Sequence, residues 1–200
     1  MLRFLSVIFL ATVITLPAQA DLLCGGDTIF EGHASVQMED KSIRSLILNG
    51  VGKKRYLFFD VLFAALYVET PSEDGPAIIE AVDEVKIMVI HALVKAKKNQ
   101  LVDAWNSEFD RLCEDQCDEL RPFHEQFISY ADDVNKKERL IVTFKSDRVE
   151  LETSRGDVFD PVMSGEYGRL MLRSSIGEEP NDDVVKKGML GDYDKYCDEY

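Results

Sequence analysis

Several short stretches of the chain are rich in β-branched and aromatic residues, and these stretches predict β-strands. We expect strands over residues 28–38, 43–48, 85–93, 140–144 and 149–153. Asn49 and Gly50 are a turn signal that ends the second of them. The longest internal apolar run, residues 56–68, indicates a buried strand or a bent pair of strands, although Ala64-Ala65-Leu66 also suits a helix.

Elsewhere the apolar residues recur three or four positions apart, which predicts helices. Leu101, Trp105 and Phe109 share one face of the first, and a second begins near Pro122. Further helices are expected over residues 77–82, 165–176 and 182–190, the last capped by Asn181 and stopped by Gly191. Because strands and helices come in runs, the pattern favours an α+β fold with a largely antiparallel sheet. We expect one domain over residues 25–191, followed by an acidic tail over 192–200.

The first twenty residues have a separate pattern. Arg3 precedes an apolar run from Phe4 to Leu16, and the small residues Ala18 and Ala20 follow it. This order is typical of a secretory signal peptide, and the run is shorter than the ~20 apolar residues of a membrane span. We therefore predict a signal peptide over 1–20 cleaved after Ala20, a periplasmic or secreted protein, and no transmembrane segment after cleavage. An uncleaved anchor is the alternative.

Export changes the interpretation of the four cysteines, because an even number in an oxidising compartment favours disulfides. Cys113 and Cys117 are four residues apart near a predicted helix end and within bridging reach. Cys24 and Cys197 flank the mature chain and would tie its ends together. Free thiols are the alternative. A metal site is disfavoured because Cys-x₃-Cys without a nearby histidine is a poor zinc pattern.

The charge balance restricts the classes of molecule that the protein is expected to bind. The chain of 200 residues has 37 Asp and Glu against 23 Lys and Arg, a net charge of −14, which argues against nucleic-acid binding. One basic island, Lys53-Lys54-Arg55, precedes the long apolar run, and Tyr67 lies near the end of that run. A cation and a phenol beside an apolar strand would hold the anionic head of a ligand whose tail is apolar. The alternative is a solvated turn and a tyrosine that only packs.

No catalytic motif is present in the sequence. The three histidines, His33, His91 and His124, are far apart, and His91 lies in an apolar strand where we expect a core residue. No serine-hydrolase, zinc-protease or nucleotide-binding motif occurs, and the glycines of residues 49–52 are too few for a phosphate-binding loop. We therefore predict no catalytic residue, no metal and no cofactor.

Three segments, taken in order, resemble the chalcone isomerase-like superfamily, especially its exported bacterial branch. They are LNGVGKKRYLFFDVLFAALYVE (48–69), LVDAWNSEF (101–109) and the stretch over 154–191. The resemblance covers roughly residues 28–191 and implies an open-faced β-sandwich, a large antiparallel sheet covered by a layer of helices, with an apolar cleft between them. It also implies that Lys54, with Arg55 beside it, and Tyr67 hold a carboxylate. Residues Leu57–Phe63, Trp105 and Phe109 would line or back the cleft.

The isomerases of this superfamily have features that this chain does not match. They carry a tyrosine at the start of the helix after the central strand, and none occurs here between His91 and Leu112. They also carry Ser or Thr after a C-terminal Gly-x-x-Pro, where this chain has Asn181 and Asp182, and an acid there would repel a phenolate. We predict an exported, non-catalytic protein that binds a fatty acid or similar small amphipathic anion. The alternatives are a structural or interaction protein with a closed core, of unknown partner, and an isomerase-type intramolecular lyase.

Overall fold

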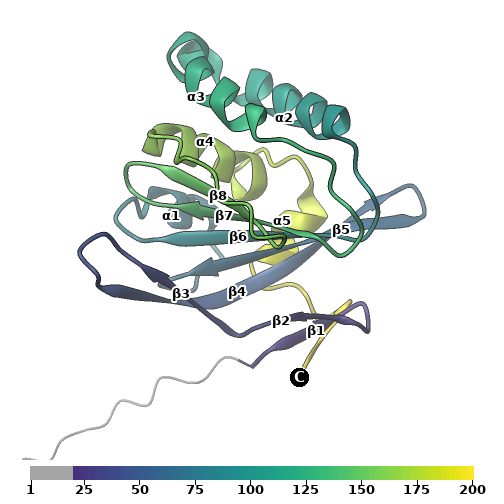
Figure 1. The fold of residues 1–200 in the computed structure, drawn as a ribbon. Helices are drawn as coiled ribbons and strands as arrows, with labels where there is room; N and C mark the ends of the chain where they lie inside the picture. Colours follow the sequence, from purple (N-terminus) through teal and green to yellow (C-terminus); the bar gives the residue numbers. More distant parts are fainter. Residues whose placement is uncertain (1–19) are drawn as a thin grey trace, which may run out of the picture.

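The computed structural model describes residues 20–200 (Figure 1). The predicted signal peptide therefore lies outside the described residues, except for Ala20. Six antiparallel strands form a large sheet in the order β3-β4-β5-β6-β7-β8. Their bounds are β3 His33–Gln37, β4 Ile43–Tyr56, β5 Phe59–Val68, β6 Lys86–Ala92, β7 Arg139–Phe144 and β8 Val149–Thr153.

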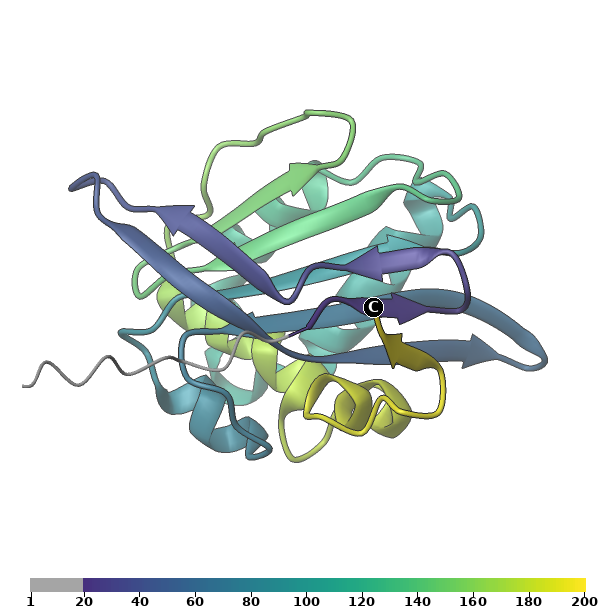
Figure 2. The same cartoon turned by 90° about the horizontal axis from the view of Figure 1, so that it is seen from below.

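A second, small sheet lies against one face of the large sheet (Figure 2). Its antiparallel order is β2-β1-β9. The bounds are β1 Leu22–Cys24, β2 Thr28–Phe30 and β9 Cys197–Glu199. Cys24 and Cys197 are register partners in β1 and β9, and a disulfide joins them as predicted. The segment predicted as an acidic tail thus contributes a strand, and so does the segment before residue 25.

Helices cover the other face of the large sheet (Figure 1). Their bounds are α1 Gly75–Glu80, α2 Lys98–Leu112, α3 Cys117–Ser129, α4 Gly165–Ile176 and α5 Asp183–Met189. A single 3₁₀ turn, Glu114–Gln116, joins α2 to α3, and the second predicted disulfide, between Cys113 and Cys117, spans this turn. No helix within residues 20–200 is long and apolar enough to cross a membrane.

The predicted turn at Asn49 and Gly50 is wrong. Strand β4 continues through these residues with a bulge and turns only at Leu57 and Phe58. The Asn49 amide instead donates to the carbonyl oxygens of Ser72 (3.0 Å) and Met189 (2.8 Å). A Cβ on Gly50 or Gly52 would collide with the backbone of α5 or the residues after it, so the two glycines allow this helix to lie directly on β4.

Three other boundaries differ from the sequence prediction. The strand expected over 28–38 is two strands in different sheets, separated near Gly32, whose amide donates to the Asp21 carboxylate at 2.7 Å. Pro122 lies inside α3 and not at its start. Asp182 caps α5 in place of Asn181, because its carboxylate accepts from the amides of the first turn.

Both faces of the central strands are buried, and each face belongs to a different core. Along β5, Ala64, Leu66 and Val68 face the helices, whereas Phe63, Ala65 and Tyr67 face the small sheet. This double burial explains why β5 and β6 are almost continuously apolar in sequence. The predicted fold class is confirmed: an α+β sandwich in which helices cover a large antiparallel sheet.

Candidate functional site

An apolar cavity of about 360 Å³ lies between the large sheet and helices α2, α3 and α4. Apart from Lys54, the sheet lines it with aliphatic and thioether side chains, and the helices line it with aromatic, aliphatic and a few polar ones. Among them are Leu62 and Ala64 of β5, Met88 and Ile90 of β6, Trp105 and Phe109 of α2, and Phe127 of α3. Trp105 and Phe109 therefore line the cavity, as predicted. The volume lies within the ~300–1,000 Å³ range of small-molecule sites, and the lining suits an alkyl chain.

Lys54 lines this cavity from strand β4. It is the register partner of Leu62, and paired residues in a sheet present their side chains on the same face. Among the described residues that line the cavity, Lys54 has the only cationic side chain. No described carboxylate forms an ion pair with its ammonium, whereas both neighbours, Lys53 and Arg55, pair with Asp60 at 3.2 and 3.0 Å. The structure thus leaves one ammonium of the basic island free to meet a ligand.

Tyr67 and Arg55 do not reach the cavity. Tyr67 is five residues from Leu62 along β5, and side chains alternate with a period of two, so Tyr67 points to the opposite face. It is buried in the core under the small sheet, where loss of solvent raises the pKa of its phenol. Arg55 is exposed on the β4–β5 hairpin. Of the three predicted ligand-binding residues, the structure places only Lys54 at the cavity.

The predicted lining segment Leu57–Phe63 is mostly elsewhere. Leu57, Phe58 and Phe59 are exposed at the hairpin tip, and Phe63 packs under the small sheet. Leu62 alone of the apolar members lines the cavity. The prediction treated the segment as one buried run, but the hairpin turn inside it carries the first half into solvent.

A buried polar pair on the helical wall was missed by the sequence analysis. Ser164 caps α4 by accepting from the amide of Tyr167, which fixes Tyr167 in the first turn. The Tyr167 hydroxyl lies 3.0 Å from Nδ1 of His124, and Nε2 of His124 lies 2.8 Å from Oδ1 of Asn106. The ring of Phe109 stacks on His124 with centroids 4.2 Å apart. The helical spacing of His124 with Phe127, and of Tyr167 with Leu170, was the available signal that both face inward.

Burial lowers the pKa of His124 to about 4, so the imidazole is neutral near pH 7. Since the Asn106 oxygen can only accept, Nε2 carries the proton and donates it, and Nδ1 accepts from the Tyr167 hydroxyl. All three groups are thereby satisfied within the protein. His124 and Tyr167, which both line the cavity, therefore make this part of its wall polar but uncharged.

A second polar group on the wall joins α2 to the loop before α5. Glu108 accepts from Ser174 at 3.1 Å and pairs with Arg111 at 2.6 Å. Asn181, which follows the Gly-x-x-Pro segment, donates to Ser174 at 3.4 Å and lines the cavity. The carboxylate of Glu108 is therefore neutralised by its own helix. An amide stands at the position where the isomerases carry a hydroxyl.

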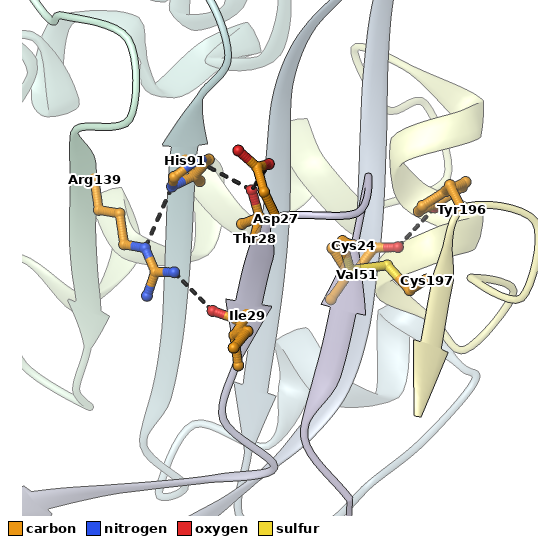
Figure 3. Close-up of a disulfide and its surroundings, with 9 residues drawn as sticks. All are labelled: Cys24, Asp27, Thr28, Ile29, Val51, His91, Arg139, Tyr196 and Cys197. Carbon is orange, nitrogen blue, oxygen red and sulfur yellow. Dashed lines mark hydrogen bonds between the residues drawn. A yellow bond between two sulfur atoms is a disulfide. The ribbon is translucent and has the colours of Figure 1, made fainter. Parts of the chain in front are cut away.

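The opposite face of the sheet contains His91, and its contacts are structural (Figure 3). Arg139 donates to Nδ1 of His91 at 3.3 Å and to the Ile29 carbonyl at 2.7 Å, while Nε2 of His91 faces the Thr28 hydroxyl at 3.4 Å. Burial, together with Arg139, lowers the pKa of His91. The prediction of a core histidine is confirmed: it ties the small sheet to the large one. Within residues 20–200, no three His, Cys, Asp or Glu side chains gather as a metal site.

We compared the sequence and the fold with those of known proteins. A solved structure of a fatty-acid binding protein from Arabidopsis thaliana shares the fold, with a TM-score of 0.60 and 18% sequence identity. The match covers 78% of this chain and 96% of that chain. No curated protein matches the chain in sequence. The sequence profile of the chalcone isomerase-like family matches residues 31–191, which include the whole large sheet and the helices α1 to α5. The chain therefore belongs to the chalcone isomerase-like family.

Proposed function

We propose that the protein binds a fatty acid, or a similar small amphipathic anion, in the cavity and does not act as an isomerase. The observation that carries the proposal is the combination of an apolar cavity of about 360 Å³ with one unpaired ammonium, that of Lys54, on its wall. The likeness to a fatty-acid binding protein supports it. The cavity also argues against the alternative of a closed core.

The chemistry of such a ligand matches the two parts of the cavity. Each methylene buried against Leu62, Trp105 and Phe127 contributes about 0.8 kcal/mol. The carboxylate would pair with Lys54, which has no competing partner because Asp60 is occupied by Lys53 and Arg55. An ammonium is a point charge without the bidentate fork of arginine, so it would attract the carboxylate without fixing its orientation.

Lys53 and Lys54 provide a matched pair for the test. They are adjacent and carry the same charge, but Lys54 lines the cavity, whereas Lys53 lies 5.3 Å from the Tyr196 ring centroid. Residues 21–200 are titrated with palmitate and with the corresponding fatty alcohol. We expect saturable palmitate binding that Lys54→Met weakens about tenfold and that Lys53→Met leaves unchanged. Binding of the alcohol should be equal in all three proteins, since it has no charge to pair.

Two results would contradict the proposal. The first is an absence of saturable binding of either lipid. The second is an equal effect of Lys53→Met and Lys54→Met, which would indicate general electrostatics and no headgroup site. Turnover of a chalcone by the wild-type protein would instead favour the isomerase alternative.

We further propose that the chain is exported after cleavage following Ala20. The two disulfides, Cys24–Cys197 and Cys113–Cys117, support this, because disulfides persist in oxidising compartments. Expression of the full chain in a bacterium, followed by fractionation and mass spectrometry, tests it. We expect a periplasmic protein that begins at Asp21 and lacks free thiols. A full-length, reduced protein in the cytoplasm would contradict the proposal.

A further inference from the structure

The tip of the β4–β5 hairpin exposes four consecutive large apolar side chains. Tyr56, Leu57, Phe58 and Phe59 are 69%, 75%, 85% and 69% exposed. Figure 1 shows the hairpin projecting beyond the ends of the neighbouring strands. Single exposed apolar residues are common on protein surfaces, but a contiguous group of this kind marks a surface that binds something.

The backbone of the tip is also unfavourable for the residue that it carries. Leu57 has φ of 54° at the first of the two turn positions, in the left-handed region. Hairpin turns with this geometry usually place glycine there, because a side chain is strained. A leucine at this position does not help the fold. Its presence is explained if the apolar tip is itself needed.

The charges beside the tip are the reverse of those on the rest of the protein. Residues 53–60 contain three cations, Lys53, Lys54 and Arg55, and one carboxylate, Asp60, in a chain of net charge −14. Basic residues next to a group of exposed aromatic and aliphatic side chains are the pattern of a segment that lies at an anionic lipid surface. The apolar tip would enter the headgroup region, and the cations would remain at the level of the phosphates.

We propose that this hairpin tip docks the protein on an anionic lipid bilayer. The local charge beside the tip favours this occupant over a second copy of the same chain, because two hairpin tips that met each other would bring two basic groups together, whereas an anionic surface complements them. The cavity lies along the same two strands, since Lys54 and Leu62 line it. Docking would therefore hold the cavity near the membrane, but it does not require that the cavity bind a lipid.

Co-sedimentation with lipid vesicles tests the proposal. Residues 21–200 are mixed with vesicles of phosphatidylcholine alone and with vesicles that also contain phosphatidylglycerol. The test variant is Leu57→Gly/Phe58→Ser, which removes the two most exposed of the four apolar side chains and relieves the positive φ, so it should fold normally. The control is Ile43→Ser, because Ile43 is equally exposed (69%) at the other end of β4. Circular dichroism checks that all the proteins are folded.

We expect the wild-type protein to bind the anionic vesicles, and to bind them less as salt is added. The tip variant should need about tenfold more lipid for half-maximal binding, whereas Ile43→Ser should match the wild type. No binding to either vesicle, or equal binding by the tip variant, would overturn the proposal. Equal binding to the two vesicle types would overturn the choice of an anionic surface. A dimer that the tip variant dissociates would identify a second copy as the occupant and also overturn it.

The outcome is separable from that of the fatty-acid proposal. Palmitate titration is done without vesicles, and Leu57 and Phe58 are outside the cavity lining. A tip variant that loses vesicle binding and keeps palmitate binding supports docking alone. The Lys54→Met variant is excluded from the vesicle series because that residue lines the cavity.

Discussion

Both faces of the large sheet are buried under a covering layer, and the cavity described above lies on the helical face. On the helical face, Leu62 and Met88 border the cavity of about 360 Å³. On the other face, Phe63, Ala65 and Tyr67 pack under the small sheet. The covering layers explain the contrast. The helices bridge over the sheet with polar groups satisfied among themselves, whereas the small sheet is closed within itself by a disulfide and held on the large sheet by the contacts of His91 and Arg139. Strand β5 thus contributes to a cavity wall and to a closed core on alternate residues.

The largest expected effect concerns the fastening of the closed face. Cys24–Cys197 closes a loop with a sequence separation of 173, and Cys113–Cys117 closes one with a separation of 4. By loop-closure entropy, Cys24→Ala/Cys197→Ala should lower the free energy of unfolding by about 5 kcal/mol, and Cys113→Ala/Cys117→Ala by about 2 kcal/mol. Urea denaturation of both double variants measures the difference. Equal losses would show that the small sheet is held mainly by other contacts.

The next effect compares neighbouring residues on the two faces. Phe63 is 1% exposed in the closed core, so Phe63→Ala should lower the free energy of unfolding by about 4 kcal/mol. Leu62 already borders empty space, so Leu62→Ala should lower it by only about 1 kcal/mol, because fewer packing contacts are lost. Leu62→Ala should change palmitate affinity, and Phe63→Ala should not where the protein remains folded. Urea denaturation and palmitate titration separate the two. If Phe63→Ala weakened palmitate binding and Leu62→Ala did not, the ligand would bind on the small-sheet face and not in this cavity.

These two residues also show how much the sequence could predict. The apolar run over 56–68 indicates buried strand structure. Once the register shows that Lys54 pairs with Leu62, the alternation of side chains along β5 places Leu62 and Tyr67 on opposite faces, because they are five residues apart. The register depends on the bulges at Leu48/Gly50 and Lys54/Arg55, which no local pattern reveals. The residue pattern and the resemblance both paired Lys54 with Tyr67, but neither could show that the two side chains lie on opposite faces of the sheet.

Other features required contacts between distant segments. The small sheet pairs the two ends of the described chain, and neither Leu22–Cys24 nor Cys197–Glu199 is long enough to indicate a strand. Gly50 and Gly52 resembled a turn because their reason for being glycine, the approach of α5, lies more than 130 residues away. Periodic segments such as α2 and α4 were predictable because amphipathic spacing is local.

A smaller effect is the pH dependence that His124 gives to the helical face. Burial depresses the folded-state pKa of His124 to about 4, below the ordinary value near 6.5. The unfolded chain then binds more protons, so this stabilisation is complete above about pH 6.5 and is lost as the pH falls toward 4. The wild-type protein should lose about 2 kcal/mol more than His124→Gln between pH 7 and pH 4.5. Urea denaturation at the two pH values measures it. Equal losses in the two proteins would show that His124 does not cause the fall in the free energy of unfolding at low pH.

The smallest expected effect is the one that decides where Tyr67 belongs. Its ring is buried under the small sheet, and its hydroxyl has no hydrogen-bond partner among the described residues. Tyr67→Phe therefore keeps the packing and removes no bond, so the free energy of unfolding should change by less than about 0.5 kcal/mol. Palmitate affinity should be unchanged, because Tyr67 does not line the cavity. Weaker palmitate binding by Tyr67→Phe, with stability unchanged, would mean that the ligand is held on the small-sheet face. The contrast between a binding face and a closed face would then have to be reversed.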